Sequence, residues 1–205
     1  MGETKQRASA AAQEYLEQRY GGTFTYSAPW GSFYTSKDVI QMLFTSSELG
    51  EDVYVKGRQE NGEYTFQDNY LAVKYKGQMA EAIQAVADDC FGSAKVFYDI
   101  LVQPVSPDLG PDASFQDYSA DASSGAAGTV VVSSEHFDES QAELFSDKLS
   151  KAGLGAFLRF VVVDQTQFED IDLAGVNDII GTDTVRFFKT LNVYANNAAD
   201  GSGEG

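Results

Sequence analysis

Residues 138–163, DESQAELFSDKLSKAGLGAFLRFVVV, contain the pattern that decides the fold: a capped helix, a glycine stop and a buried strand. Asp138 is placed to cap a helix, and Gln141 follows three residues later as the reciprocal partner of a capping box. Apolar residues then recur at helical spacing: Ala142, Phe145, Leu149 and Ala152. Two glycines end the helix, and the apolar run 157–163 predicts a strand buried on both faces.

The same order of elements occurs twice more in the chain. A helical pattern from about residue 5 ends at Gly21-Gly22 and leads into β-rich sequence. A second helical pattern over 78–91 ends at Gly92, and a mainly apolar strand is predicted at 94–102. Helices that lead directly into strands in this way predict an α+β fold, with helices packed on one or two mainly antiparallel sheets.

Further strands are predicted between these helices. The segments 53–55 and 64–66 flank Asn61-Gly62, a pair that supplies the positive φ angles of a tight hairpin turn. Residues 23–28 form a strand that Pro29 breaks, and residues 39–45 form another.

Residues 66–75 have two interpretations. They begin a helix capped by Asp68, or they form a turn at Asp68-Asn69 followed by a strand, and the strand is favoured. Near the end of the chain, a short helix is predicted near 165–171 and a strand at 184–194.

The distribution of charge suggests an organisation in segments. Residues 1–104 hold the first helix, the antiparallel strands and the second helix, and residues 129–195 form a strand-helix-strand region expected to share the same core. Residues 105–128 contain four Asp and no basic residue, which is typical of an acidic loop or linker. Residues 196–205 are polar and are expected to form a disordered tail.

The net charge of −17, from 31 acidic and 14 basic side chains, excludes one class of partner. Nucleic-acid binding needs clustered Lys and Arg, and here they are few and scattered. No run of about 18 apolar residues occurs, so no direct membrane insertion is expected. Cationic partners, divalent ions and neutral ligands remain open.

The residues that most often carry catalysis are scarce. Cys90 is the single cysteine, and it follows two Asp at a predicted helix end, where its thiol is poorly activated and is expected to be a buried structural group. His136 is the single histidine and is expected to be a surface residue before a helix. The sequence therefore predicts no catalytic residue and no organic cofactor.

Two groups of residues are candidates for binding. Glu169, Asp170 and Asp172 are weak candidates for a divalent cation, although runs of acid are usually solvated faces. The aromatic residues Trp30, Phe33 and Tyr34 lie near Pro29 and are candidates for partner binding, although such clusters more often cover the edge of a core.

Two segments, YLEQRYGGTF at 15–24 and FQDNY at 66–70, resemble small exported or lipid-anchored proteins of Gram-positive bacteria, a likeness that covers mainly residues 10–100. The resemblance implies a place at the cell surface after signal removal, and it implies no catalytic residues. Members are often tethered through an N-terminal lipidated cysteine, whereas this chain has no cysteine near its start.

The leading hypothesis is a non-enzymatic, exported domain at the bacterial cell surface that binds a protein, peptide or surface component. The alternatives are a carboxylate-based metal-dependent hydrolase that uses the acidic residues, and a cytoplasmic interaction protein.

Overall fold

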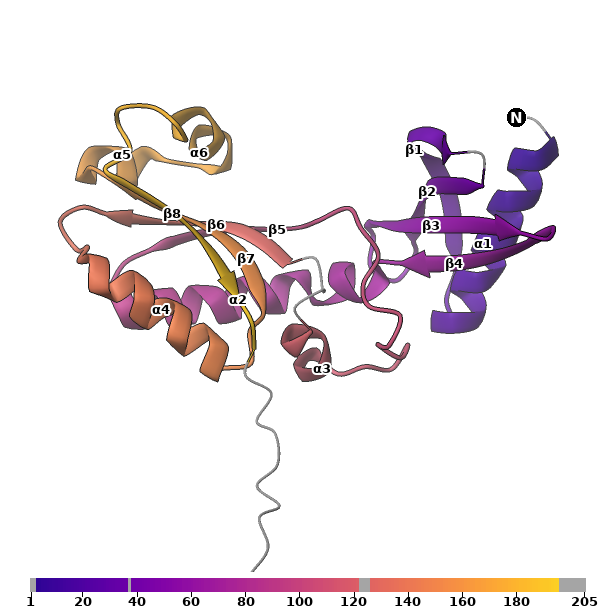
Figure 1. Ribbon diagram of the computed structural model, residues 1–205, viewed down its shortest axis with the longest axis horizontal. Helices are drawn as coiled ribbons and strands as arrows, with labels where there is room; N and C mark the ends of the chain where they lie inside the picture. Colours follow the sequence, from indigo (N-terminus) through magenta and orange to yellow (C-terminus); the bar gives the residue numbers. More distant parts are fainter. Residues whose placement is uncertain (1–2, 37, 122–125, 196–205) are drawn as a thin grey trace, which may run out of the picture. The chain divides into compact units, whose positions relative to one another are not determined.

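The computed structural model describes residues 3–36, 38–121 and 126–195. The chain forms two compact units: one runs to residue 75 and includes 102–114, and the other takes in 76–101 and continues from 115. Each unit holds a four-stranded sheet with helices, so the α+β fold with mainly antiparallel sheets is confirmed (Figure 1).

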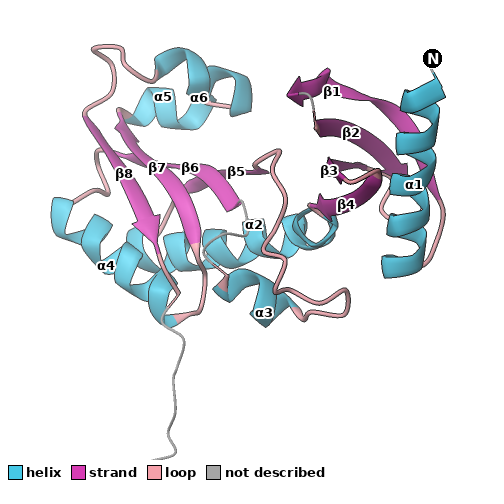
Figure 2. Cartoon of the chain, turned by 45° about the vertical axis from the view of Figure 1, so that its right-hand side comes forward, coloured by secondary structure: helices cyan, strands magenta, loops and turns pink. Residues whose placement is uncertain are grey.

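The sheet of the first unit is an antiparallel meander whose strands follow one another in chain order. Its elements are α1 (Glu3–Tyr20), β1 (Phe24–Ser36), β2 (Val39–Ser46), β3 (Asp52–Glu60) and β4 (Glu63–Asp68). Helix α1 lies across one face of this sheet (Figure 2) and buries Ala8, Ala12 and Leu16. These three residues repeat every four positions, so they share one face of the helix.

The predicted hairpin is confirmed as β3 and β4. Asn61 and Gly62, the two residues between the strands, have φ angles of 52° and 86°. Both central residues of a type I′ turn need a positive φ, which Asn and Gly adopt at the lowest cost.

Two predictions for the first unit are wrong. Pro29 does not end a strand, because β1 continues through it to Ser36 with register shifts on both sides. The strand lies at the edge of its sheet, where a residue without an N–H is tolerated.

The strand favoured over 66–75 is also wrong, because β4 ends at Asp68 and helix α2 (Tyr70–Phe91) begins two residues later. The Asp68 carboxylate accepts the Tyr70 N–H at 2.9 Å, which satisfies a free donor at the start of the helix. Asn69 completes the junction: its side chain accepts the N–H of Tyr54 and its own N–H donates to the Tyr54 carbonyl.

The sheet of the second unit has strands in chain order, and only its central pair, β6 and β7, is parallel. Its strands are β5 (Lys95–Ile100), β6 (Ala126–Ser133), β7 (Ala156–Val163) and β8 (Phe187–Val193). Its helices are α3 (Phe115–Ala120), α4 (Glu139–Lys151), α5 (Gln165–Asp170) and α6 (Leu173–Ile179), together with most of α2. Helices α2 and α4 cover one face, and α5 and α6 cover the other (Figure 1).

The helix and strand predicted within residues 138–163 are largely confirmed. The capping box of Asp138 and Gln141 opens α4, and Gly153 follows its end with a φ of 72°. Strand β7 is buried on both faces from Phe160 onward, whereas Phe157, at its start, is 45% exposed.

The segment 105–128 is more structured than a loop or linker. Helix α3 lies inside it with Tyr118 fully buried, and β6 already begins at Ala126. Residues 102–114 belong to the first unit, so the unit boundaries do not coincide with the segments 1–104 and 129–195 expected from charge. The predicted tail, 196–205, lies outside the described residues.

Candidate binding groove between α1 and β4

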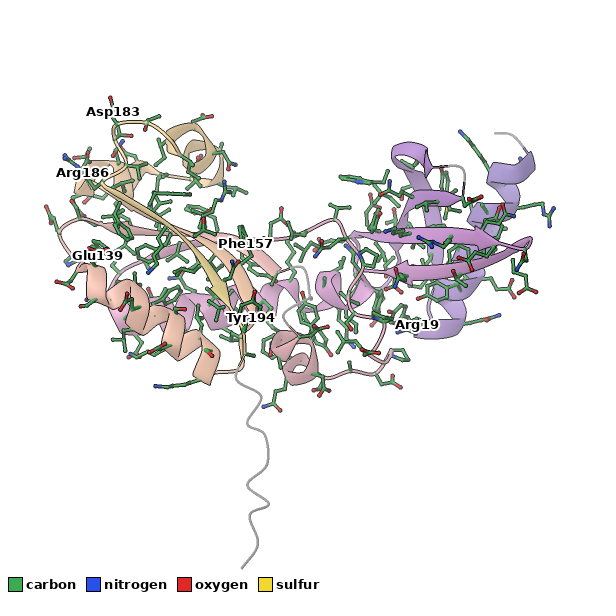
Figure 3. The ribbon with its side chains drawn as sticks, in the orientation of Figure 1. Arg19, Glu139, Phe157, Asp183, Arg186 and Tyr194 are labelled. Carbon is green, nitrogen blue, oxygen red and sulfur yellow. The ribbon has the colours of Figure 1, made fainter. Side chains whose placement is uncertain are left out.

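A buried carboxylate, Asp68, holds the end of α1 against β4. The side chain of Asp68 is 2% exposed, and its two oxygens accept the hydroxyls of Tyr15 and Tyr20 at 2.7 and 2.8 Å. The guanidinium Nε of Arg19 lies 3.9 Å from the same carboxylate. Three residues of the last two turns of α1 therefore meet one acidic residue at the end of β4, and Figure 3 shows Arg19 in this part of the helix.

The tyrosines of this cluster are held in their neutral form. Burial and the charge of Asp68 raise the pKa of Tyr15 and of Tyr20. Burial and the neighbouring Glu48 raise the pKa of Tyr70 to about 12, and its ring stacks on that of Tyr20 at 4.0 Å. Each of these hydroxyls therefore keeps its proton at neutral pH and donates it to a carboxylate.

The segment 105–107 closes one side of this cluster. The N–H of Val105 donates to the Asp68 carbonyl at 2.9 Å, and Arg19 donates to the carbonyl of Leu109 at 2.7 Å. A small cavity of about 100 Å³ remains beside the carboxylate. Because the partners of Asp68 come from its own chain, this cluster acts as an anchor for the neighbouring surface.

That surface is an open groove of about 650 Å³ between α1 and β4. It is lined by Ala11, Glu14, Tyr15, Gln18, Glu63, Tyr64, Thr65 and Phe66. The four residues from β4 are consecutive, so side chains from both faces of the strand contribute, and the groove follows the strand edge.

Aromatic rings form the floor of the groove. Tyr64 and Phe66 stack with their ring centroids 5.8 Å apart, and Tyr15 meets Phe66 at 5.5 Å. All three side chains are half-buried, so each keeps an accessible part. The rim is acidic, because Glu14 and Glu63 are exposed and no lining residue is basic.

The aromatic candidates Trp30, Phe33 and Tyr34 lie on β1, the opposite edge strand of the same sheet. The Trp30 side chain is 41% exposed and packs edge-on against Tyr54, with ring centroids 6.4 Å apart. The side chains of Phe33 and Tyr34 lie outside the described part of the structure. Their role in partner binding stays a prediction.

The acidic candidates lie on α5 and at the start of α6. Asp172 caps α6 by accepting the N–H of Gly175 at 2.8 Å, and Glu169 accepts the side-chain amide of Gln165 at 2.9 Å. Asp170 lines a separate hollow of about 230 Å³ that is mainly apolar. Within the described ranges, no three His, Cys, Asp or Glu side chains are arranged to hold a metal ion.

Cys90 and His136 are the one cysteine and the one histidine of the sequence. His136 is exposed, as predicted, whereas Cys90 is half-buried and not fully buried. Burial and the neighbouring Asp89 raise the pKa of the Cys90 thiol, and these effects outweigh the opposing Lys148 ammonium. The thiol is therefore a poor nucleophile at neutral pH.

Sequence reasoning missed the groove because its two walls are distant in the chain. The alternation of Tyr64 and Phe66 was the available signal, since alternate residues of a strand share one face. The position of Tyr15 opposite them depends on how α1 packs. The residues of the two segments that carried the resemblance, 15–24 and 66–70, do meet, at Asp68.

No family model, curated protein sequence or solved structure matches this chain. No helix in the described part of the chain is both long and apolar enough to cross a membrane. The geometry of the groove therefore carries the functional argument.

Proposed function

We propose that this chain is a non-enzymatic binding domain that holds a protein, peptide or surface component at the bacterial cell surface. The observation that carries the proposal is the groove between α1 and β4, which combines half-buried aromatic rings with an acidic rim. Aromatic side chains supply a large contact area, and a few polar groups at the rim give orientation.

The chemistry of the described side chains favours binding over catalysis. The one thiol has a raised pKa, and the one imidazole is exposed on the surface of the second unit. The most buried carboxylate, Asp68, is already hydrogen-bonded by two tyrosines and a backbone N–H. No observation favours the hydrolase alternative, because the acidic candidates on α5 and α6 do not form a metal-binding group.

The location is part of the same proposal and rests on the resemblance of residues 15–24 and 66–70. The gene, expressed with its own upstream sequence in a Gram-positive host, is expected to yield protein that external protease cleaves on intact cells. Protein found only in the cytoplasmic fraction would support the cytoplasmic alternative.

Selection of random peptides displayed on phage tests the binding function. We expect the chain to enrich a consensus, and the Tyr64→Ala variant to lose the enriched peptides. Trp30→Ala is the matched control, because it removes an exposed aromatic ring from the opposite edge of the same sheet. Loss with Trp30→Ala alone would move the site to the aromatic candidates on β1, and no enrichment in any selection would contradict peptide binding.

A further inference from the structure

We propose that the groove takes an extended peptide that carries Lys or Arg and pairs with the edge of β4 as a fifth strand of the sheet. The inference rests on the proposed function and names its ligand class. It depends on three features of the groove: an edge strand that no other strand of the described residues pairs with, an aromatic floor and a negatively charged rim.

The free edge follows from the hydrogen bonds of β4. Its carbonyl at Asp68 faces away from β3, because it accepts the N–H of Val105. In an antiparallel strand the N–H and C=O of one residue point the same way and alternate along the chain, so Phe66 and Tyr64 also point outward. Among the described residues, the backbone hydrogen bond of this segment to β4 is the one at Asp68, although residues 105–107 also share a small cavity with Phe66 and Gln67. Tyr64 and Phe66 both line the groove.

The dimensions suit an extended chain. Strand β4 has six residues, and a strand rises about 3.3 Å per residue, so its edge is about 20 Å long. An added strand would place alternate side chains over the rings of Tyr64 and Phe66, with α1 on the far side of the groove. Peptides bind this way when main-chain hydrogen bonds supply affinity and pockets for alternate side chains supply specificity.

The acidic side chains of the groove favour a peptide that carries positive charge. Glu14 and Glu63 stand on opposite walls, Glu14 is held by the side-chain amide of Gln18, and the whole chain carries −17. Two basic residues of α1 lie one helical turn outside the lining: Arg7 precedes Ala11, and Arg19 follows Tyr15 and is engaged by Asp68 and the carbonyl of Leu109. An acidic peptide would be repelled, whereas Lys or Arg would pair with the rim.

The charge test uses defined peptides and titration calorimetry. A six-residue peptide of Val and Thr with two Lys is expected to bind, and its counterpart with two Glu is not. The double variant Glu14→Gln, Glu63→Gln should weaken binding about twofold to thirtyfold, the range expected when two exposed ion pairs are lost. Arg7→Gln, the control, should leave binding unchanged or tighten it. Equal binding of both peptides would overturn the charge argument.

The strand test uses backbone methylation. Two versions of the Lys peptide are prepared, each methylated on every second amide nitrogen. One version loses the N–H groups along one edge of the extended peptide, and the other loses those along the opposite edge. Because the rings of the groove fix which side chains face inward, one version should bind like the parent and the other should lose binding. If both bind like the parent, or if both lose it, the added strand is wrong.

A substitution in β4 itself tests the same hydrogen bonds a second time. Tyr64→Pro removes an outward N–H and leaves the ladder to β3 intact, since proline is tolerated on an edge. It should bind more weakly than Tyr64→Ala, which removes only the ring, and equal affinities would count against strand addition. Phage-selected peptides that need Tyr64 but lack basic or extended character would refute this inference and leave the proposed function standing.

Discussion

At the scale of single residues, Asp68 has the largest predicted effect on stability. Replacing it with Ala leaves the hydroxyls of Tyr15 and Tyr20 and the N–H of Tyr70 without their acceptor, and removes the carboxylate beside Arg19. We expect the free energy of unfolding to fall by about 3–5 kcal/mol, the usual cost of removing one member of a buried charged pair.

Denaturant unfolding measures this loss. Asp52→Ala is the control, because Asp52 also accepts two side-chain hydroxyls but is exposed, and the change should be about 0.5 kcal/mol. Similar losses for the two variants would show that burial of Asp68 is not important.

The tyrosines around Asp68 predict a dependence of stability on pH. Burial raises the pKa of Tyr15 and Tyr20, so the folded chain keeps these protons at a pH where the unfolded chain releases them. Their contribution is complete below about pH 10, the unfolded value, and falls as the pH rises above it.

Unfolding curves from about pH 8 to about pH 11 should therefore show a steeper loss for the wild type than for Tyr20→Phe, which has no proton to release. The titrations of the lysines and of the other tyrosines cancel when the two free energies of unfolding are subtracted, because both proteins contain these groups. Parallel curves for the two chains over this range would contradict the prediction.

Gly57 is required by close packing and not by its backbone angle. A Cβ atom at this position would lie 2.8 Å from Ile40 Cγ1 and 2.8 Å from Phe66 Cε1. We expect Gly57→Ala to destabilise the chain by about 1–3 kcal/mol, as measured by denaturant unfolding, because the core has no room for a methyl group. Phe66→Leu combined with Gly57→Ala should recover part of the loss, whereas simple additivity of the two changes would argue against a clash.

At the scale of elements, one glycine inside α2 and one directly after it predict opposite effects. Gly77 lies inside the helix, is exposed, and has open space where a Cβ would stand. Gly77→Ala should stabilise the chain by about 1 kcal/mol, since Ala loses less backbone entropy in a helix. Gly92 follows the helix with a φ of 70°, so Gly92→Ala should cost roughly 1–2 kcal/mol through left-handed strain alone.

Thermal and denaturant unfolding of the two variants provide the measurement. The two substitutions add the same methyl group at positions with free space, so they differ only in backbone conformation. Changes of the same sign would contradict the helix boundary.

Local signals predicted most elements where a turn or cap is encoded in adjacent residues. Asn61-Gly62 placed the hairpin and Asp138 placed the start of α4. The prediction was wrong at the junction after Asp68, where the sequence fits both a helix and a strand. The choice depends on the hydrogen bond between Asn69 and Tyr54, which are fifteen residues apart. Pro29 misled for a related reason, because a proline is tolerated only once the strand is known to lie at an edge.

The candidate site was predictable to a smaller extent. Scarcity of His and Cys could be read directly from the sequence, and it directed attention to surfaces. The groove could not be read, because Tyr15 and Phe66 come together only when α1 packs on the sheet. The acidic candidates on α5 and α6 failed to converge because local hydrogen bonds already use Glu169 and Asp172: one accepts a side-chain amide, and the other caps a helix.

At the scale of the whole molecule, the excess of acid is the dominant electrostatic feature. Of the 31 acidic residues only 14 can be matched by a basic one, and the ion pairs found in the described ranges are mostly exposed. Such pairs stabilise little, so the folded chain carries a net self-repulsion that the expanded, unfolded chain relieves.

Salt should therefore stabilise this protein. We expect the melting temperature to rise as NaCl increases from about 10 mM to about 150 mM and then to level off, as the screening length shortens to about 8 Å. A melting temperature that is independent of salt would show that the charges are too far apart to repel.

Divalent ions extend the same measurement to the hydrolase alternative. At matched ionic strength, Ca²⁺ and Mg²⁺ should raise the melting temperature only modestly more than NaCl, because diffuse screening has no binding constant. A specific site would give a larger shift that keeps rising with the logarithm of the ion concentration above the dissociation constant, since the ion binds only the folded state. If such a shift appeared and Glu169→Gln with Asp172→Asn removed it, these residues would be metal ligands and the enzyme interpretation would regain its basis. A logarithmic shift of this kind that the double variant leaves unchanged would place a metal site elsewhere on this acidic chain.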